Sequence, residues 1–206
     1  MKPELIFVTG YFGAPIRETA ERMADEKGYE LISLDDEIER ADGRSVLRIC
    51  MMMGEHEYRN KEYELLSTIV SDAESAAVGS AVDVQSAGGA SRAKDVENAS
   101  SVGAAGNARA AGAAGNAKSS ENTSTKNTVI LCGDGVLHDE MSRDIIKKHR
   151  LIIVGSDMTR DELWENAVSI KDSYHAFMHF GSDESRRKAF DELYERQRKL
   201  YASMGV

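Results

Sequence analysis

The chain has 206 residues, of which 41% are hydrophobic and 30% are charged, and its formal net charge is −9 at pH 7. Such an acidic balance argues against a general nucleic-acid binder or a protein of anionic membrane surfaces. No apolar stretch approaches the roughly 20 residues that a membrane span needs, and no signal peptide is evident at the N-terminus. Cys50 and Cys132 lie singly in apolar runs, which is typical of buried thiols in a reducing compartment. We therefore expect a cytoplasmic protein.

The first expected strand leads into a glycine loop. Residues 4–9 form an apolar run typical of a buried strand, and residues 10–19 (GYFGAPIRET) continue into helix-forming sequence. This is the context in which GxxxxGK(S/T) binds phosphate, because Gly10 and Gly13 let amide groups turn inward toward a helix N-terminus. The last glycine, the lysine and the metal-binding Ser or Thr of that motif are replaced, in order, by Pro15, Ile16 and Arg17. The loop thus keeps the flanking strand and helix of a phosphate-binding loop and lacks the side chains that bind phosphate and Mg²⁺.

Further elements alternate along the chain. Strands are expected over residues 4–9, 30–34, 128–132 and 151–154, and helices over 16–27, 36–40, 45–53, 55–71, 139–149, 160–170 and 185–201. Strands that alternate with helices imply βαβ units and a parallel sheet covered on both faces. The sequence therefore predicts an α/β fold.

The composition changes abruptly between residues 72 and 127. This stretch is rich in Ala, Gly, Ser and Asn, and GAAGNAR (103–109) recurs as GAAGNAK (112–118). It cannot bury enough apolar surface to offset the entropy of ordering, so we predict a disordered insertion, inert rather than a regulatory tether. Because it falls between a helix and a strand, residues 1–71 and 128–206 can form a single domain around it.

Polar residues follow the second and third expected strands. Asp35 and Asp36 end the second strand, Gly133-Asp-Gly135 ends the third, and Arg59 lies on the helix between them. Ligands bind beyond the carboxyl ends of parallel strands. An aspartate that accepts from hydroxyls, an arginine that grips a carboxylate and a glycine turn would together suit a polyhydroxy acid.

Four segments resemble the shikimate kinase family in order and spacing: LDDEIE (34–39), GRSV (43–46), GEHEYR with Glu62 (54–59) and CGDGVL (132–137). The resemblance covers residues 3–70 and 128–201. It implies a P-loop kinase-like three-layer domain with a parallel sheet, and the chain ends at Val206 before the family's last strand. It also implies ATP-dependent phosphorylation of shikimate, in the pathway to aromatic amino acids, by a monomer that uses ATP and Mg²⁺.

The resemblance assigns residues to the acceptor side. Asp35 would bind the shikimate hydroxyls and help to activate the attacking one, Arg59 would clamp the carboxylate, and Gly133 and Gly135 would line the same pocket.

The family has a further carboxylate-binding arginine before a Leu-Tyr pair. Here Gln197 stands at that spacing before Leu200-Tyr201, so its neighbours Arg196 and Arg198 are the candidates for this role.

The departures from the family lie on the nucleotide side. Gly10, Gly13, Ala14 and Arg17 are the residues left for the nucleotide, Ser33 replaces the first Asp of Asp-x-Asp, and Asp134 replaces the middle glycine of the turn. The family's Arg-Pro-Leu lid motif is not recognisable in residues 171–180. Three interpretations follow. In the first, Arg17 serves as the catalytic cation of a re-registered loop, with Asp134 recruiting Mg²⁺. In the second, the chain is a pseudoenzyme that binds shikimate or a related acid as a sensor or regulator. In the third, it is a degenerate gene product that binds no ligand.

Simpler structural roles compete with these assignments. Asp35 and Asp36 would also suit the cap of a helix, and Arg59 would also pair with Glu62 three residues on. His175 and His179 have i,i+4 spacing but no evident third ligand, so no metal site is predicted, and a mobile lid or partly buried imidazoles are favoured.

Overall fold

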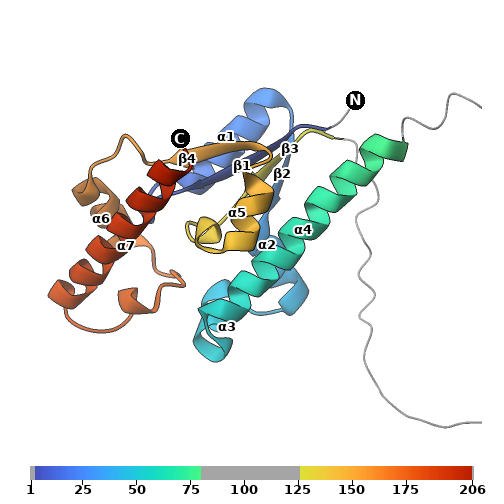
Figure 1. Cartoon of the computed structure of the whole chain (residues 1–206). Coiled ribbons are helices and arrows are strands. Elements are labelled where there is room, and N and C mark those ends of the chain that lie inside the picture. Colours follow the sequence, from blue (N-terminus) through green and yellow to red (C-terminus); the bar gives the residue numbers. More distant parts are fainter. Residues whose placement is uncertain (1–2, 80–125, 206) are drawn as a thin grey trace, which may run out of the picture.

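A parallel sheet forms the centre of the molecule (Figure 1). The computed structural model describes residues 3–79 and 126–205. Within them the strands are β1 (Leu5–Gly10), β2 (Glu30–Ser33), β3 (Thr128–Leu131) and β4 (Arg150–Val154). Their order is β2-β3-β1-β4, and every pairing is parallel. The predicted α/β architecture with a parallel sheet is confirmed.

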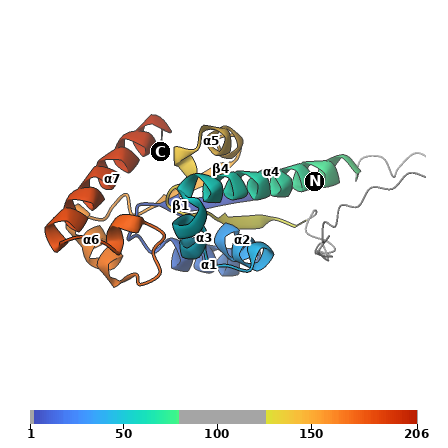
Figure 2. The ribbon, with the colours of Figure 1, turned by 90° about the horizontal axis from the view of Figure 1, so that it is seen from below.

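The side chains of β1 alternate between two apolar layers. Ile6 and Val8 pack with Ala20 and Ala24 of α1 (Ile16–Lys27) on one face of the sheet. Phe7 belongs to the larger cluster on the other face, which α4, α5 and α7 cover (Figure 2). Because successive residues of a strand point to opposite faces, this burial on both sides explains why the run is apolar throughout. The molecule has the expected three layers.

The other helices begin at residues whose side chains suit a helix start. They are α2 (Leu34–Asp42), α3 (Val46–Met53), α4 (Glu55–Gly79), α5 (Glu140–Ile146), α6 (Arg160–Ser169) and α7 (Asp183–Ser203), with 3-10 turns η2 (Val136–His138) and η3 (Ala176–Met178). The hydroxyls of Ser33, Ser45 and Ser182 cap α2, α3 and α7 by accepting from backbone amides. None of the helices that the structure describes is long and apolar enough to cross a membrane.

Helix α4 continues past the predicted boundary of the insertion. The sequence placed its end at Ser71, whereas the helix runs to Gly79. Residues 72–79 contain good helix formers, and the buried Ala73 extends the apolar stripe of Leu66 and Val70 by one more turn. The predicted end of the helix at Ser71 is therefore corrected to Gly79, and residues 80–125 of the predicted insertion lie outside the described residues.

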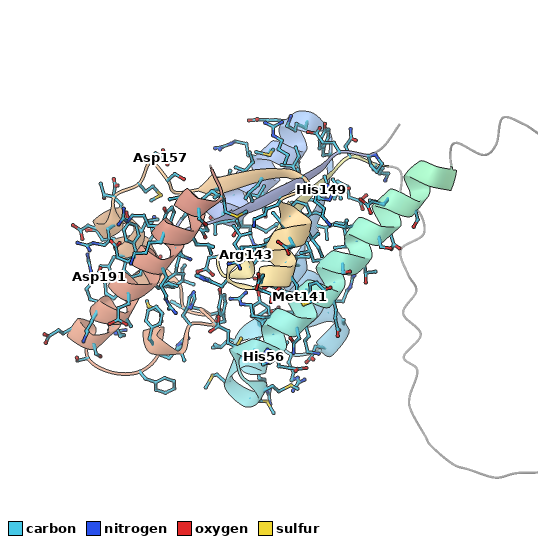
Figure 3. The ribbon with its side chains drawn as sticks, in the orientation of Figure 1. His56, Met141, Arg143, His149, Asp157 and Asp191 are labelled. Carbon is cyan, nitrogen blue, oxygen red and sulfur yellow. The ribbon has the colours of Figure 1, made fainter. Side chains whose placement is uncertain are left out.

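Helices α6 and α7 are joined by charged side chains. Asp191 of α7, labelled in Figure 3, accepts from Arg187 (Nε–Oδ1 3.1 Å) and lies 3.5 Å from Nε of Arg160 at the start of α6. Arg187 also pairs with Asp161. These contacts hold α7, which carries part of the site described next, against the first turn of α6.

Candidate functional site

Asp35 lies at the carboxyl end of β2 and faces helix α4. The Tyr58 hydroxyl lies 2.6 Å from Oδ1 of Asp35 and 3.2 Å from Oε1 of Glu62. The cap of α2 is Ser33, whose hydroxyl accepts from the Asp36 amide (3.3 Å), so the Asp35 side chain is not the cap. Burial raises the pKa of Asp35 although the Tyr58 bond and the charge of Arg59 oppose that rise. The Asp35 carboxylate therefore contacts Tyr58 of α4 and not the backbone amides of α2.

Arg59 is the main cation of this cluster. Its guanidinium pairs with Glu62 and with Glu55 (Nη2–Oε1 3.1 Å), and it lies over the ring of Tyr58 at 4.7 Å. Only 10% of its side chain is exposed. Burial disfavours its charge, yet Glu62, Tyr174 and Tyr58 together outweigh burial and keep the pKa of Arg59 well above its usual value. The predicted pairing with Glu62 is present, and it fixes the arginine in the cluster.

The turn after β3 closes on the same cluster. A Cβ at Gly135 would collide with the Arg59 guanidinium, 2.5 Å from its Cζ, and a Cβ at Gly133 would lie 3.0 Å from the Tyr58 hydroxyl. Arg143 of α5 donates to the carbonyl of Leu137 (3.3 Å) and supports this turn (Figure 3). The structure therefore brings together Asp35, Arg59, Gly133 and Gly135, which the sequence assigned to the acceptor.

Asp134, the residue between the two glycines, is the centre of a buried network. It accepts from the Tyr174 hydroxyl, His175 (Nε2–Oδ2 2.9 Å) and Gln197 (Nε2–Oδ2 3.2 Å). Burial opposes its ionisation, but the charge and hydrogen bond of His175 and the Tyr174 bond lower the pKa of Asp134 to about 2. Its oxygens are thus engaged within the protein. The expected recruitment of Mg²⁺ by Asp134 stays a prediction.

Several members of this network were not assigned a role in the site from the sequence. Tyr174 and His175 belong to residues 171–180, where no lid motif was recognised. The sequence distinguishes Gln197 only by its spacing, yet the residue is 1% exposed. Leu193 and Tyr201, four residues to either side, are also buried on α7, and this helical stripe is the signal that could have placed Gln197 inward.

The two neighbours of Gln197 lie outside the cluster. Arg196 and Arg198 are exposed on α7, and Arg198 pairs with Glu195 (2.9 Å). Residues adjacent on a helix point in directions about 100° apart, so an inward Gln197 turns both arginines away from Asp134.

The glycine loop uses its amide groups within the protein. The Tyr11 amide donates to the Val154 carbonyl (3.0 Å) and the Ala14 amide to the Tyr11 carbonyl (2.9 Å). The Phe12 amide donates to Oε1 of Gln197 (3.2 Å). A phosphate cradle requires such amides to point at the ligand, and in this conformation they do not.

The packing of the loop agrees with its hydrogen bonds. Gly13 has φ +91°, and a Cβ there would lie 2.9 Å from the carbonyl carbon of Leu163 in α6. The Phe12 ring is buried against His175, with ring centroids 4.4 Å apart. Gly10 and Gly13 therefore serve close packing against β4 and α6.

Arg17 is directed toward β2. It binds Asp36 through two hydrogen bonds, Nη1–Oδ2 2.9 Å and Nη2–Oδ1 2.8 Å, and 47% of its side chain is exposed. Among the described ranges, no group of three or more His, Cys, Asp and Glu side chains is arranged to hold a metal ion. In this conformation the loop amides and Arg17 are engaged within the protein and are not turned toward a triphosphate.

Comparison with known proteins identifies the relatives of this chain. The model of the family "Shikimate kinase" matches residues 17–91, so the match begins directly after the glycine loop. A shikimate kinase from Chlorobium phaeobacteroides is 37% identical over 68 residues, which are 33% of this chain and 34% of that protein. The chain thus matches about a third of the length of this curated relative.

Two solved structures share the fold. A shikimate kinase from Acinetobacter baumannii in complex with shikimate aligns with a TM-score of 0.63 at 15% identity, covering 98% of this chain and 80% of that one. A shikimate kinase from Bacteroides thetaiotaomicron aligns with a TM-score of 0.61 at 15% identity, covering 97% and 82%. Part of the chain is therefore similar in sequence to shikimate kinases, and the chain has the fold of the solved shikimate kinases.

Proposed function

We propose that this protein binds shikimate or a related hydroxylated carboxylic acid as a sensor or regulator, without phosphorylating it. The observation that carries the proposal is a contrast within one site. Asp35, Arg59 and the glycine turn are gathered as an acceptor site requires, whereas the loop amides of Tyr11, Phe12 and Ala14 are spent on internal hydrogen bonds. The proposed location is the cytoplasm, and the proposed state is a monomer.

The roles within the site follow from its chemistry. Asp35 would accept hydrogen bonds from ligand hydroxyls, and Arg59 would bind the carboxylate through its planar donors. Glu62 holds the arginine in place and keeps it charged. The complex of shikimate with the Acinetobacter baumannii enzyme, which has this fold, supports the choice of ligand class.

Phosphorylation of shikimate by ATP is the second candidate function, and one observation favours it. Arg17 follows the glycine loop, and its guanidinium is half-exposed beside the carboxyl end of β2. Release from Asp36 would give the loop a cation in place of the missing lysine. Removing a key charged group from such a site commonly costs about 10³-fold in rate, so this function would depend strongly on Arg17.

Calorimetric titration with shikimate, 3-dehydroshikimate and quinate tests the proposal. The informative variant is Arg59→Lys, which keeps a positive charge beside the buried Glu62 and loses the two-pronged geometry. Arg198→Lys, on the exposed face of α7, is the matched control. We expect binding of at least one acid, at least tenfold weaker in Arg59→Lys and unchanged in Arg198→Lys. Absence of binding to the wild-type protein would contradict the proposal.

Phosphorus NMR of ATP, Mg²⁺ and shikimate with stoichiometric protein separates the two candidates. We expect no shikimate phosphate. A signal that disappears in both Arg59→Lys and Arg17→Ala would instead establish the kinase, whereas a signal that persists in both would come from a contaminating enzyme.

A further inference from the structure

The hydroxyl of Tyr174 lies between the cation and the central anion of the site. It accepts a hydrogen bond from Nη2 of Arg59 (2.8 Å) and donates one to Oδ1 of Asp134. The Arg59 guanidinium also lies over the Tyr174 ring, 5.1 Å from its centroid. The same hydroxyl lies 3.0 Å from the position of a Cβ at Gly135. Tyr174 thus lies beside Arg59 where the arginine meets the glycine turn.

Neighbouring residues hold Tyr174 in this position. The rings of Tyr174 and His175 have centroids 4.3 Å apart, and His175 binds the second oxygen of Asp134. Gln197 donates to both the carbonyl and the carboxylate of Asp134, at 3.0 and 3.2 Å. Asp134 is therefore tied both to the segment that carries Tyr174 and to α7.

The acceptors around Arg59 differ in charge and in origin. Glu55 and Glu62 are carboxylates on the same helix, four residues before and three residues after the arginine. Tyr174 is neutral and comes from a segment 115 residues further along the chain. A carboxylate makes a stronger hydrogen bond to guanidinium than a neutral hydroxyl does. The Tyr174 hydroxyl is therefore the acceptor that an acidic ligand would replace most readily.

We propose that the Tyr174 hydroxyl stands in for the ligand on Arg59, and that an acid binds to this site by displacing it. This inference rests on the proposed function and names the residues that set its selectivity. Asp134 acts in two ways, because it accepts from the Tyr174 hydroxyl and because its charge opposes a second carboxylate beside it. Tyr174 and Asp134 then select for ligands whose carboxylate binds Arg59 strongly enough to replace an internal partner.

Calorimetric titration of shikimate into wild type, Tyr174→Phe, Asp134→Asn and Tyr29→Phe tests the competition. Tyr174→Phe keeps the ring and removes the competing hydroxyl. Asp134→Asn keeps the shape and removes the opposing charge, so it tests the same idea if Tyr174→Phe folds poorly. Tyr29→Phe is the control, because its hydroxyl also binds a carboxylate (Glu4 Oε2, 2.6 Å) but lies at the opposite end of the strands.

We expect Tyr174→Phe and Asp134→Asn each to bind shikimate about tenfold more tightly, since a net hydrogen bond to a charged group is of this size. Tyr29→Phe should bind like the wild type. If Tyr174 and Asp134 only support the fold of the site, both variants will bind more weakly, and that result would overturn the inference. Equal binding to all four proteins would overturn it while leaving the proposed function intact. Failure of every protein to bind would refute both.

Discussion

Gly135→Ala tests the central contact of the site, the approach of the β3 turn to Arg59. Gly135 has φ −105° and ψ −3°, a conformation that alanine adopts without strain. The substitution therefore adds only a methyl group, which would collide with the guanidinium 2.5 Å from Cζ. An arginine usually moves aside at little cost, but Glu62, Glu55 and Tyr174 hold this one.

The expected loss follows from these contacts. Overpacking costs typically about 1–3 kcal/mol, and a displaced Arg59 also weakens hydrogen bonds worth about 1.5–3 kcal/mol each. We expect a loss of about 3 kcal/mol in the free energy of unfolding for Gly135→Ala. Gly133→Ala is the graded comparison, because its nearest neighbours are the Tyr58 hydroxyl at 3.0 Å and Glu62 Oε1 at 3.3 Å. A small adjustment relieves that contact, so its cost should be about 1 kcal/mol.

Urea unfolding, followed through the single tryptophan, measures both values. Trp164 contacts Phe190 of α7, with centroids 5.2 Å apart, so its fluorescence reports on the packing of α6 against α7. Midpoints at equal slope give the difference in stability. Equal stability of Gly135→Ala and Gly133→Ala would refute the reasoning, because it would mean that Arg59 does not occupy the space above the turn.

Three further predictions concern the loop and the buried network. Gly13→Ala should lower the free energy of unfolding by about 3 kcal/mol or more, because the strain of a left-handed backbone conformation adds to a collision with Leu163. Urea unfolding checks this beside Gly28→Ala, which has the left-handed conformation without the collision, and equal losses of stability in the two variants would contradict the prediction. The pKa of Asp134 is lowered to about 2 from 3.8. This shift adds about 2 kcal/mol to the free energy of unfolding above pH 4, and the contribution is lost as the pH falls through 2. Asp134→Asn should lack this loss when unfolding is followed in acid titrations, and identical titration profiles of the variant and the wild type would refute the prediction. A double-mutant cycle on Arg17→Ala and Asp36→Ala should give a coupling energy below about 1 kcal/mol, since 47% and 57% of these side chains are exposed. A larger coupling energy would mean that the ion pair with Asp36 holds Arg17 firmly and keeps it from turning toward the loop.

The fold could be predicted from the sequence because its signals are local. The apolar run of residues 4–9 and the helix of residues 16–27 depend on neighbours within a few positions, and the structure has them as β1 and α1. The end of α4 could not be placed, because the Ala-rich composition after Ser71 suits both a helix and a disordered segment. Packing of Ala73 in the core favours the helix there.

The candidate site could be predicted only in part, for a similar reason. Asp35 and Arg59 belong to segments with recognisable spacing, and the structure brings them together. Tyr174 meets Arg59 across 115 positions and Asp134 across 40. No periodicity or short motif encodes such contacts, and the residues that surround Tyr174 lack the family's lid motif. Gln197 illustrates the intermediate case, since its spacing was recognised while its burial depends on the helical stripe of α7.

Helix α4 also separates the site from the place where the described chain is interrupted. Its first turns carry Tyr58 and Arg59, and at about 1.5 Å per residue its 25 residues extend roughly 37 Å to Gly79, near the N-terminus in both views (Figures 1 and 2). The chain resumes at the same end, where the Asn127 carbonyl accepts from the Glu30 amide (3.0 Å). Both attachment points therefore lie far from the acceptor cluster. A fluorescent reporter attached at either point would therefore stand well away from Tyr58 and Arg59.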